Sequence, residues 1–218
     1  MRVVVAGGHG QIGRRLLRLL VDAGHQAVGL VRNPDHVDHV RAAGAEAAVI
    51  DLEHSDIEAV AAVLGGADAV VFAAGAGPGS GATRKQSMDR DGAVLLADAA
   101  VAAAVPRYLM VSSVNAVEPD DEDAADSDDV FQIYLRAKGA ADVAVRSRGL
   151  DWVVLRPGQL TDDPGTNRVR LSASVPGGAV PRDDVAAVLL ALLVAGTSGV
   201  TLELAAGDTE VESAVRGL

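Results

Sequence analysis

The sequence predicts a three-layer α/β domain built on a doubly wound, parallel sheet. Short aliphatic runs of strand length alternate with segments of helical spacing along the whole chain. Repeated βα units form a parallel sheet with helices on both faces, and right-handed crossovers wind such a sheet in both directions. No internal repeat or linker divides the 218 residues, a length that suits one domain.

The first strand and the turn after it give the clearest signal. Residues 3–6 are an aliphatic run, glycines follow at positions 7, 10 and 13, and leucines at helical spacing come next. Between a strand and a helix, this spacing is typical of a dinucleotide site. Gly7 permits a tight turn, Gly10 lets a pyrophosphate approach the backbone, and Gly13 lets the helix pack against the strand. The helix N-terminus offers free N–H groups to phosphates. An ordinary strand-to-helix turn is the alternative.

The remaining elements follow from the same two patterns. An aliphatic run of four to six residues predicts a buried strand, and apolar residues three or four positions apart predict a helix. In chain order, the first half predicts strand 26–31, helix 34–43, strand 45–50, helix 57–64, strand 69–73 and helix 88–104. The second half predicts strand 108–112, helix 131–147, strand 151–155, helix 185–194 and strand 201–204. Residues from about 158 to 182 form a small segment expected on the substrate side.

Two stretches interrupt this alternation. Residues 75–81 read GAGPGSG at the carboxyl end of a strand, the edge of the sheet where ligands bind. A functional lid and a plain flexible connection are both open interpretations. Residues 118–129 are an acidic run, which usually forms a solvated loop. Repulsion of anionic substrates is the alternative for this run.

Composition limits the classes of function and location. The net charge of −11 argues against a nucleic-acid partner. The chain has no cysteine, which excludes disulfides and thiolate metal sites, and its histidines lack carboxylates at metal-binding spacing. His36 and His39, three apart on a predicted helix, are interpreted as part of a polar face. The first residues form a predicted core strand rather than a leader, and no apolar run is long enough to span a membrane. We therefore expect a cytoplasmic monomer or homodimer with a small-molecule substrate and no metal.

Arg32, at the end of the second predicted strand, bears on the choice of cofactor. Proteins that bind NAD usually place an acidic residue here to accept from the ribose 2′-OH. An arginine pairs instead with a 2′-phosphate, which favours NADP over NAD. Asp35 lies close by and weakens this preference, and a surface arginine is the alternative. Asp51 follows the third strand, where we expect it near the adenine or as a helix cap.

A candidate catalytic group lies in the middle of the chain. Tyr134 and Lys138 are four apart on a predicted helix and therefore share a face. A nearby ammonium favours the phenolate, which makes the tyrosine a better proton donor or acceptor for a carbonyl/alcohol pair. Ser113 follows the fifth strand at the same sheet edge, where its hydroxyl can hydrogen-bond the reacting oxygen. The Y-x-x-x-K spacing is common by chance, so its weight comes from the order of the motifs.

This order resembles the short-chain dehydrogenase/reductase superfamily, and most closely its atypical, epimerase- and dehydratase-like NAD(P)-binding members. The matching segments are GGHGQIG, LVRNP, VIDLE, VFAAGAG, MDRDGA, YLMVSSVNA, YLRAK, VVLRPGQL and the tail LELAAGDTEVESAV. The resemblance implies a Rossmann fold with NADP across the sheet edge. It implies Ser113, Tyr134 and Lys138 as catalytic residues, with Lys138 also holding the nicotinamide ribose. The cofactor-binding residues that it implies are Gly7, Gly8, His9, Gly10, Gln11, Ile12, Gly13, Arg32, Asp51, Leu52, Ala73, Ala74, Gly75, Val111, Tyr134, Lys138 and Pro157.

Two departures from the superfamily pattern affect the expected chemistry. Asp89 stands where most members have an asparagine, although an aspartate recurs in the atypical group, and we place it with the catalytic residues. The segment 158–182 is shorter than the usual substrate lobe, which implies a small or open pocket. The first hypothesis is an NADP-dependent reductase or dehydrogenase of a small carbonyl compound, with Tyr134 as proton donor. The alternatives are a non-catalytic NADP-binding sensor, a flavin- or tetrapyrrole-type reductase, and a sugar-nucleotide epimerase-like enzyme.

Overall fold

The computed structural model describes residues 1–77, 79–119 and 129–218, and its centre is a nine-stranded sheet. The strand order is β11-β8-β10-β6-β5-β4-β1-β2-β3. The strands are β1 (Arg2–Ala6), β2 (Gln26–Val31), β3 (Glu46–Val49), β4 (Ala69–Phe72), β5 (Arg107–Val111), β6 (Asp151–Pro157), β8 (Arg168–Ser172), β10 (Val200–Ala206) and β11 (Thr209–Glu210). From β3 to β10 the strands are parallel, and β8 and β11 extend the far edge in antiparallel pairing. The prediction of a doubly wound, mostly parallel sheet is confirmed.

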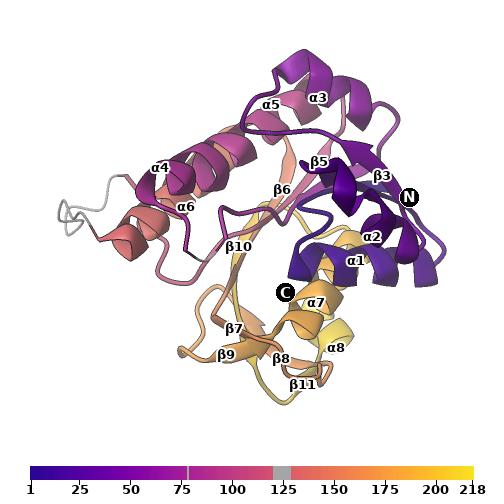
Figure 1. Ribbon diagram of the computed structural model, residues 1–218. Helices are drawn as coiled ribbons and strands as arrows, with labels where there is room; N and C mark the ends of the chain where they lie inside the picture. Colours follow the sequence, from indigo (N-terminus) through magenta and orange to yellow (C-terminus); the bar gives the residue numbers. More distant parts are fainter. Residues whose placement is uncertain (78, 120–128) are drawn as a thin grey trace.

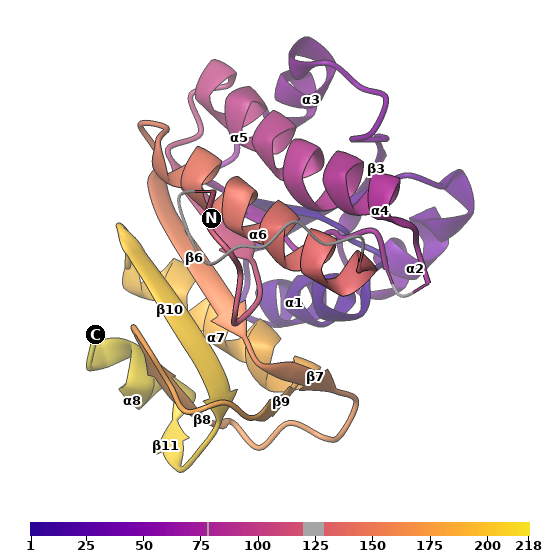
Figure 2. The same cartoon turned by 90° about the vertical axis from the view of Figure 1, so that its left-hand side faces the viewer.

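The helices form a layer on each face of the sheet (Figures 1 and 2). One layer contains α1 (Gln11–Asp22), α2 (Val37–Ala42), α7 (Arg182–Ala195) and α8 (Val211–Arg216). The other contains α3 (Ile57–Leu64), η2 (Lys85–Gly92), α5 (Ala93–Ala102) and α6 (Val130–Arg146). Two short helices, η1 (Pro34–His36) and α4 (Ala82–Arg84), precede α2 and η2. Among the described residues, no helix is both long and apolar enough to cross a bilayer.

The first strand shows why its residues are uniformly aliphatic. Val3 and Val5 point into the core beneath α1 and α7, whereas Val4 and Ala6 point into the core beneath α3 and α5, and all four are fully buried. A parallel strand covered by helices on both faces needs apolar side chains at every position. This arrangement places the carboxyl end of β1 beside that of β4, where the winding of the sheet reverses and ligands bind.

The structure differs from the predicted elements in several places. Beyond the last predicted strand, 201–204, the chain continues as β11 and α8, and the helix expected over 34–43 is divided into η1 and α2. The helix expected over 88–104 begins earlier, at Ala82, and its residues 85–92 form a π-helix before α5. The polar sequence KQSMDRDG has little apolar periodicity, so the sequence did not mark this start. The segment 158–182 contains β7 (Gln159–Thr161) and β9 (Ala179–Pro181), which pair in parallel, as well as β8. The acidic residues 120–128 and position 78 of the glycine-rich loop lie outside the described residues.

Candidate cofactor and active site

The glycine turn after β1 has the geometry that its sequence predicts. Gly7 has a φ of +82°, and a Cβ added there would lie 2.7 Å from the carbonyl oxygen of Ala73 on the neighbouring strand. A Cβ on Gly13 would collide with the carbonyl oxygen of Gly7. The Gly10 N–H donates to Gly7 O at 2.8 Å, which closes the turn ahead of α1. Only glycine fits at positions 7 and 13, and the turn leaves an open cradle in front of the helix.

A cleft of about 230 Å³ lies beside this cradle, at the carboxyl ends of β1, β2 and β4. Its lining includes eight of the predicted cofactor residues: Gly7, His9, Gly10, Arg32, Leu52, Ala73, Ala74 and Gly75. Ile50, Met88 and Ala76 add apolar walls, and Arg84 adds a second guanidinium. A glycine cradle next to an apolar slot with basic groups matches the pyrophosphate, base and ribose parts of a dinucleotide.

The other predicted cofactor residues lie around this cleft rather than among its lining residues. Gln11 is exposed at the start of α1, whereas Ile12 is buried in the core. Gly8 packs against Gly29 of β2, at a position where an added Cβ would lie 2.7 Å from the Gly29 Cα. Asp51 accepts a hydrogen bond from the Glu53 N–H at 3.0 Å and pairs with His54 at 3.0 Å. Asp51 therefore stabilises the turn 51–54, whereas the N-cap of α3 is Asp56, which accepts from the Ala59 N–H at 2.8 Å.

Glu53 was not a candidate from the sequence, and it pairs with two arginines that line the cleft. Its Oε2 lies 3.0 Å from Arg32 Nη1 and 2.8 Å from Arg84 Nη2, and Ser87 Oγ donates to its Oε1 at 2.6 Å. The hydrogen bond from Arg84 is the main cause that lowers the pKa of Glu53 to about 2, against the opposing effect of burial. The side chain of Arg32 remains 53% exposed. The arginine predicted to bind a phosphate is thus held in position at the mouth of the cleft.

Tyr134 and Lys138 meet at the carboxyl end of β5. They share one face of α6, and Lys138 Nζ lies 5.8 Å from the centre of the Tyr134 ring. Lys138 Nζ also donates to Val111 O at 3.1 Å, so it is anchored to the last residue of β5. A second ammonium, Lys85 Nζ of η2, lies 5.1 Å from the same ring. The structure therefore brings Val111, Tyr134 and Lys138 together.

Ser113 lies two residues beyond β5, in a loop that is attached to β6. Its Oγ donates to Val114 O at 3.1 Å, and the Val114 N–H donates to Pro157 O at 3.1 Å. Pro157 is buried at the end of β6, next to β5 in the sheet. The predicted residues Ser113 and Pro157 are thus neighbours at one sheet edge.

Asp89 is buried beneath this group and holds the lysine. Its Oδ1 lies 3.3 Å from Lys138 Nζ, with the two side chains only 2% and 5% exposed. Its Oδ2 accepts a hydrogen bond from the Ala76 N–H at 3.2 Å, in the loop after β4. Asp89 belongs to the π-helix η2, a distortion that often occurs at functional sites. The aspartate that replaces the expected asparagine therefore joins the lysine to the loop that borders the cofactor cleft.

A second buried ionic cluster lies one turn further along α6. Asp142 is fully buried and pairs with Arg156 at 2.8 Å, and Arg156 also reaches Glu118 at 2.9 Å. Burial raises the pKa of Asp142, and the charge and hydrogen bond of Arg156 oppose that effect. The spacing of 134, 138 and 142 by four residues is a signal that could have placed Asp142 on the same helix face. Among the residues that the structure describes, no group of three histidine or acidic side chains is arranged so that it could hold a metal ion.

Comparison with known proteins agrees with this geometry. The model of a family described as NAD(P)H-binding matches residues 7–195. The uncharacterized sugar epimerase YhfK of Bacillus subtilis is 35% identical over the full length of both chains. A solved structure from Bacillus halodurans, whose name places it among NAD-dependent epimerases/dehydratases, has 36% identity and a TM-score of 0.89 with complete coverage of both chains. The oxidoreductase ylbE from Lactococcus lactis has 26% identity and a TM-score of 0.86, over 100% of this chain and 96% of that one.

The family match begins at Gly7, the first glycine of the cradle, and includes α6 with its tyrosine and lysine. The two full-length similarities at 35% and 36% identity cover the segment 158–182 as well. Sequence family, fold and cleft therefore agree on a nicotinamide dinucleotide as the ligand class. The chain belongs to the NAD(P)H-binding family of proteins with an atypical short-chain dehydrogenase/reductase-like fold.

Proposed function

We propose that this protein is an NADPH-dependent reductase or dehydrogenase of a small carbonyl compound. The observation that supports this proposal best is the grouping of Tyr134, Lys138 and Val111 at the carboxyl end of β5, on the same sheet edge as the glycine cradle. When bound, the dinucleotide supplies the hydride that the carbonyl carbon receives. The carbonyl oxygen then needs a proton, and we assign its donation to Tyr134.

Each residue of the group has a distinct role in this proposal. The Tyr134 hydroxyl donates its proton to the carbonyl oxygen, which yields the alcohol. The Lys138 ammonium favours the phenolate that remains, because opposite charges stabilise each other at short range. Asp89 pairs with that buried ammonium and fixes its position. The Ser113 hydroxyl donates to Val114 O. It can orient the reacting oxygen by donating to that oxygen instead.

We assign the preference for NADPH over NADH to the basic mouth of the cleft. Arg32 and Arg84 both pair with Oε2 of Glu53, and Arg32 keeps half of its side chain exposed. A guanidinium pairs with a phosphate through strong, charge-assisted hydrogen bonds. The 2′-phosphate is the group that distinguishes NADPH from NADH, so Arg32 is the residue expected to select between them.

A second candidate is a flavin- or tetrapyrrole-type NADPH reductase. The observation in its favour is that Lys138 Nζ is directed inward, to Asp89 and Val111 O. A lysine that is fully engaged in this way also suits an enzyme in which the tyrosine gives no proton. The two candidates differ in what they predict for Tyr134, and this difference defines the experiment.

The experiment measures NADPH oxidation against a panel of carbonyl compounds and flavins, with wild type, Tyr134→Phe, Lys138→Ala and Tyr108→Phe. Loss of a general acid costs roughly 10²–10⁴ in rate, so we expect this loss in kcat for Tyr134→Phe, with little change in NADPH affinity. Lys138→Ala should lower both kcat and cofactor affinity. Tyr108 is the matched control, because it is fully buried and donates to Ala93 O at 2.9 Å, away from the cleft.

The outcomes separate the candidate functions. Full turnover by Tyr134→Phe on the best substrate would contradict proton donation by Tyr134 and favour the flavin- or tetrapyrrole-type reductase. Tight binding of NADPH with no turnover of any compound would favour a non-catalytic, NADP-binding sensor. Equal losses in Tyr134→Phe and Tyr108→Phe would indicate a structural effect of removing a tyrosine hydroxyl.

A further inference from the structure

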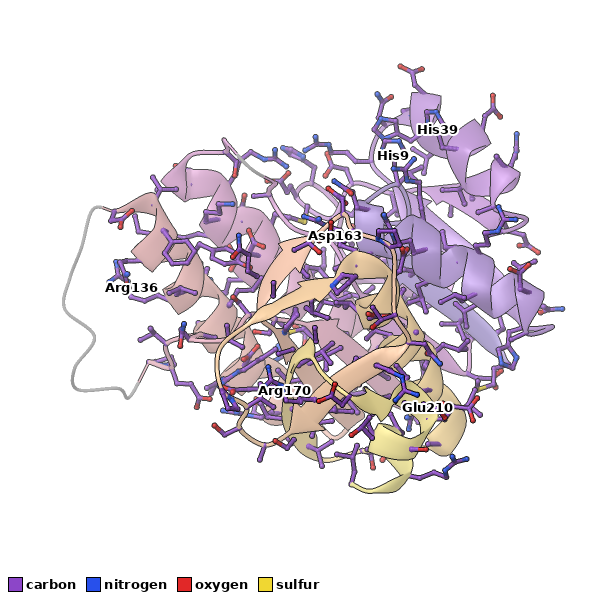
Figure 3. All side chains as sticks on the ribbon, turned by 90° about the horizontal axis from the view of Figure 1, so that it is seen from below. His9, His39, Arg136, Asp163, Arg170 and Glu210 are labelled. Atoms are coloured by element: carbon purple, nitrogen blue, oxygen red, sulfur yellow. The ribbon has the colours of Figure 1, made fainter. Side chains whose placement is uncertain are left out.

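Three imidazole rings from two parts of the chain, the glycine turn and the helical residues 34–42, lie against each other beside the cofactor cleft. The rings of His9, in the glycine turn, and His36, at the end of η1, are stacked with centres 3.6 Å apart and planes 14° from parallel. The ring of His39, from α2, lies 4.8 Å from His9 and 6.2 Å from His36. Figure 3 shows His9 and His39 side by side at one corner of the molecule. We call these three residues the histidine stack.

The histidine stack borders the part of the cleft where Arg32 lies. His9 and His36 line the cleft together with Gly10, Arg32 and Asn33. Burial lowers the pKa of His9, and the charges of His36, of Arg14 on α1 and of His39 lower it further. Protonation of His9 is therefore opposed by burial and by the positive charges of its neighbours.

The carboxylates near the stack already have cationic or polar partners. Asp38 of α2 pairs with Arg41 at 3.6 Å, and Asp35 of η1 accepts from the side chain of Asn33 at 3.4 Å. Across the cleft, Glu53 is held by Arg32 and Arg84. An anion that enters beside the stack would thus add a negative charge next to imidazoles that form no ion pair with a carboxylate among the described residues.

We propose that the histidine stack is a proton-linked subsite for the 2′-phosphate, so that the preference for NADPH over NADH increases as the pH falls. This inference rests on the proposed NADPH preference and adds the residues that regulate it. A phosphate dianion next to the rings favours their protonated forms, because it supplies the opposite charge that the ligand-free stack lacks. Binding of NADPH then takes up a proton. NADH has no 2′-phosphate and takes up none at this place.

The size of the effect follows from linkage between binding and protonation. One proton taken up completely changes the dissociation constant about tenfold per pH unit. Histidine titrates near pH 6.5, and a phosphate monoester loses its second proton near pH 6. The useful range is therefore about pH 6.5 to about pH 8.5, where the phosphate is a dianion while the imidazoles change charge. We expect the ratio of the NADH and NADPH dissociation constants to fall roughly tenfold across this range, which equals about half a proton on average.

The test measures the dissociation constants of NADPH and NADH at about pH 6.5, 7.5 and 8.5 by calorimetry. The variants are His36→Asn, His39→Asn and the control His25→Asn. His25 lies at the other end of β2, where its Nδ1 is 3.4 Å from the chain's N-terminal amine, so it reports the effect of losing a histidine elsewhere. We expect wild type and His25→Asn to show the pH-dependent ratio, and His36→Asn to show a nearly flat one.

A second measurement follows the histidine ring protons by NMR during pH titration. NADPH should raise the pKa of His36, whereas NADH should leave it unchanged. Tighter binding of NADPH by a factor that does not vary with pH would overturn the histidine proposal and leave the NADPH preference intact. A ratio that varies equally in wild type, His36→Asn and His39→Asn would also overturn it. Equal affinities for NADPH and NADH at every pH would remove both proposals.

Discussion

At the scale of single residues, Glu53 determines how the basic groups of the cleft are presented. It holds Arg84 through two hydrogen bonds, at 2.8 and 3.3 Å, and reaches Arg32 at 3.0 Å. Arginine has many rotamers, and restricting them before a ligand arrives reduces the entropy lost on binding. The Glu53 carboxylate, which is not among the lining residues, therefore orients two arginines that are.

The first residue-scale prediction concerns Arg32. Arg32→Ala should weaken NADPH binding by roughly tenfold to over a hundredfold, because a lost charge-assisted contact costs on the order of 1.5–3 kcal/mol. Binding of NADH should change little. Arg84 and Ser87 still hold Glu53 in this variant, so the cleft should keep its shape. Fluorescence titration with both cofactors measures the effect, and Arg41→Ala, an exposed arginine of α2, is the control. Equal weakening for both cofactors would remove the 2′-phosphate role.

The second residue-scale prediction concerns the charge of Glu53. Its pKa is about 2 in the folded chain against 4.5 as its ordinary value, so ionisation stabilises the fold above about pH 4.5 and this gain is lost as the pH falls toward 2. A shift of this size corresponds to about 3 kcal/mol. In urea denaturation at pH 7, the free energy of unfolding of Glu53→Gln should therefore be lower than that of wild type by an amount of this order. The deficit should shrink by more than half at about pH 3. A deficit independent of pH would show that Glu53 acts through packing.

At the scale of elements, the sequence predicted the strands of the parallel sheet well because burial on both faces leaves long aliphatic runs. The edges were harder to predict. β7 and β9 have three residues each, too few for a periodic signal. β8 does alternate, with Val169 and Leu171 between exposed neighbours, but one such strand among polar residues was not distinguished from a loop. The short helices α4 and η2 lie in a polar segment. Side chains of this segment bond to distant residues: Arg84 and Ser87 to Glu53, and Asp89 to Lys138.

The candidate site divides in the same way. The glycine cradle is local in the chain, so its spacing alone indicated its shape and ligand class. The other groupings join residues that are distant in sequence: Asp89 with Lys138, Glu53 with Arg84, and His9 with His36. Sequence order says that such residues approach one sheet edge, but it does not say which side chains pair. His36 and His39 were interpreted as a polar face for this reason, since their third partner comes from another element.

The element-scale prediction concerns the first turn of α7 and the loop before β8. Asp184 is buried and accepts hydrogen bonds from Thr166 N at 3.1 Å, Thr166 Oγ1 at 3.1 Å and Asn167 N at 2.7 Å. Asp184→Ala leaves these donors without partners, which should cost roughly 2–4 kcal/mol of unfolding free energy. Asp163→Ala, at an exposed position of the same segment, should cost less than about 0.5 kcal/mol. Urea denaturation measures both. Equal free energies of unfolding for Asp184→Ala and Asp163→Ala would mean that water accepts the hydrogen bonds of Thr166 and Asn167 in place of the carboxylate.

At the scale of the whole molecule, the cofactor cleft lies where the two halves of the sheet meet. The half built from β1, β2 and β3 supplies the glycine cradle, Arg32 and the histidine stack. The half built from β4, β5 and β6 supplies Asp89, Ser113, Tyr134 and Lys138 through its loops and helices. The loop after β4 belongs to both, because Ala76 lines the cleft and its N–H donates to Asp89. A ligand in the cleft therefore contacts both halves and should stabilise the fold as a unit.

This arrangement predicts a large thermal stabilisation by cofactor. A ligand at about 100 times its dissociation constant stabilises the folded state by about 2.7 kcal/mol. In a domain of this size each kcal/mol shifts Tm by about 2–4 °C, so saturating NADPH should raise Tm by roughly 5–10 °C. NADH at the same concentration should raise it less. Adenosine 2′,5′-bisphosphate should give part of the NADPH shift and adenosine 5′-monophosphate almost none, since only the former offers a 2′-phosphate to Arg32. Identical shifts for the two nucleotides would locate the affinity in the adenine slot, and unchanged Tm with NADPH would mean that the cleft does not bind the dinucleotide.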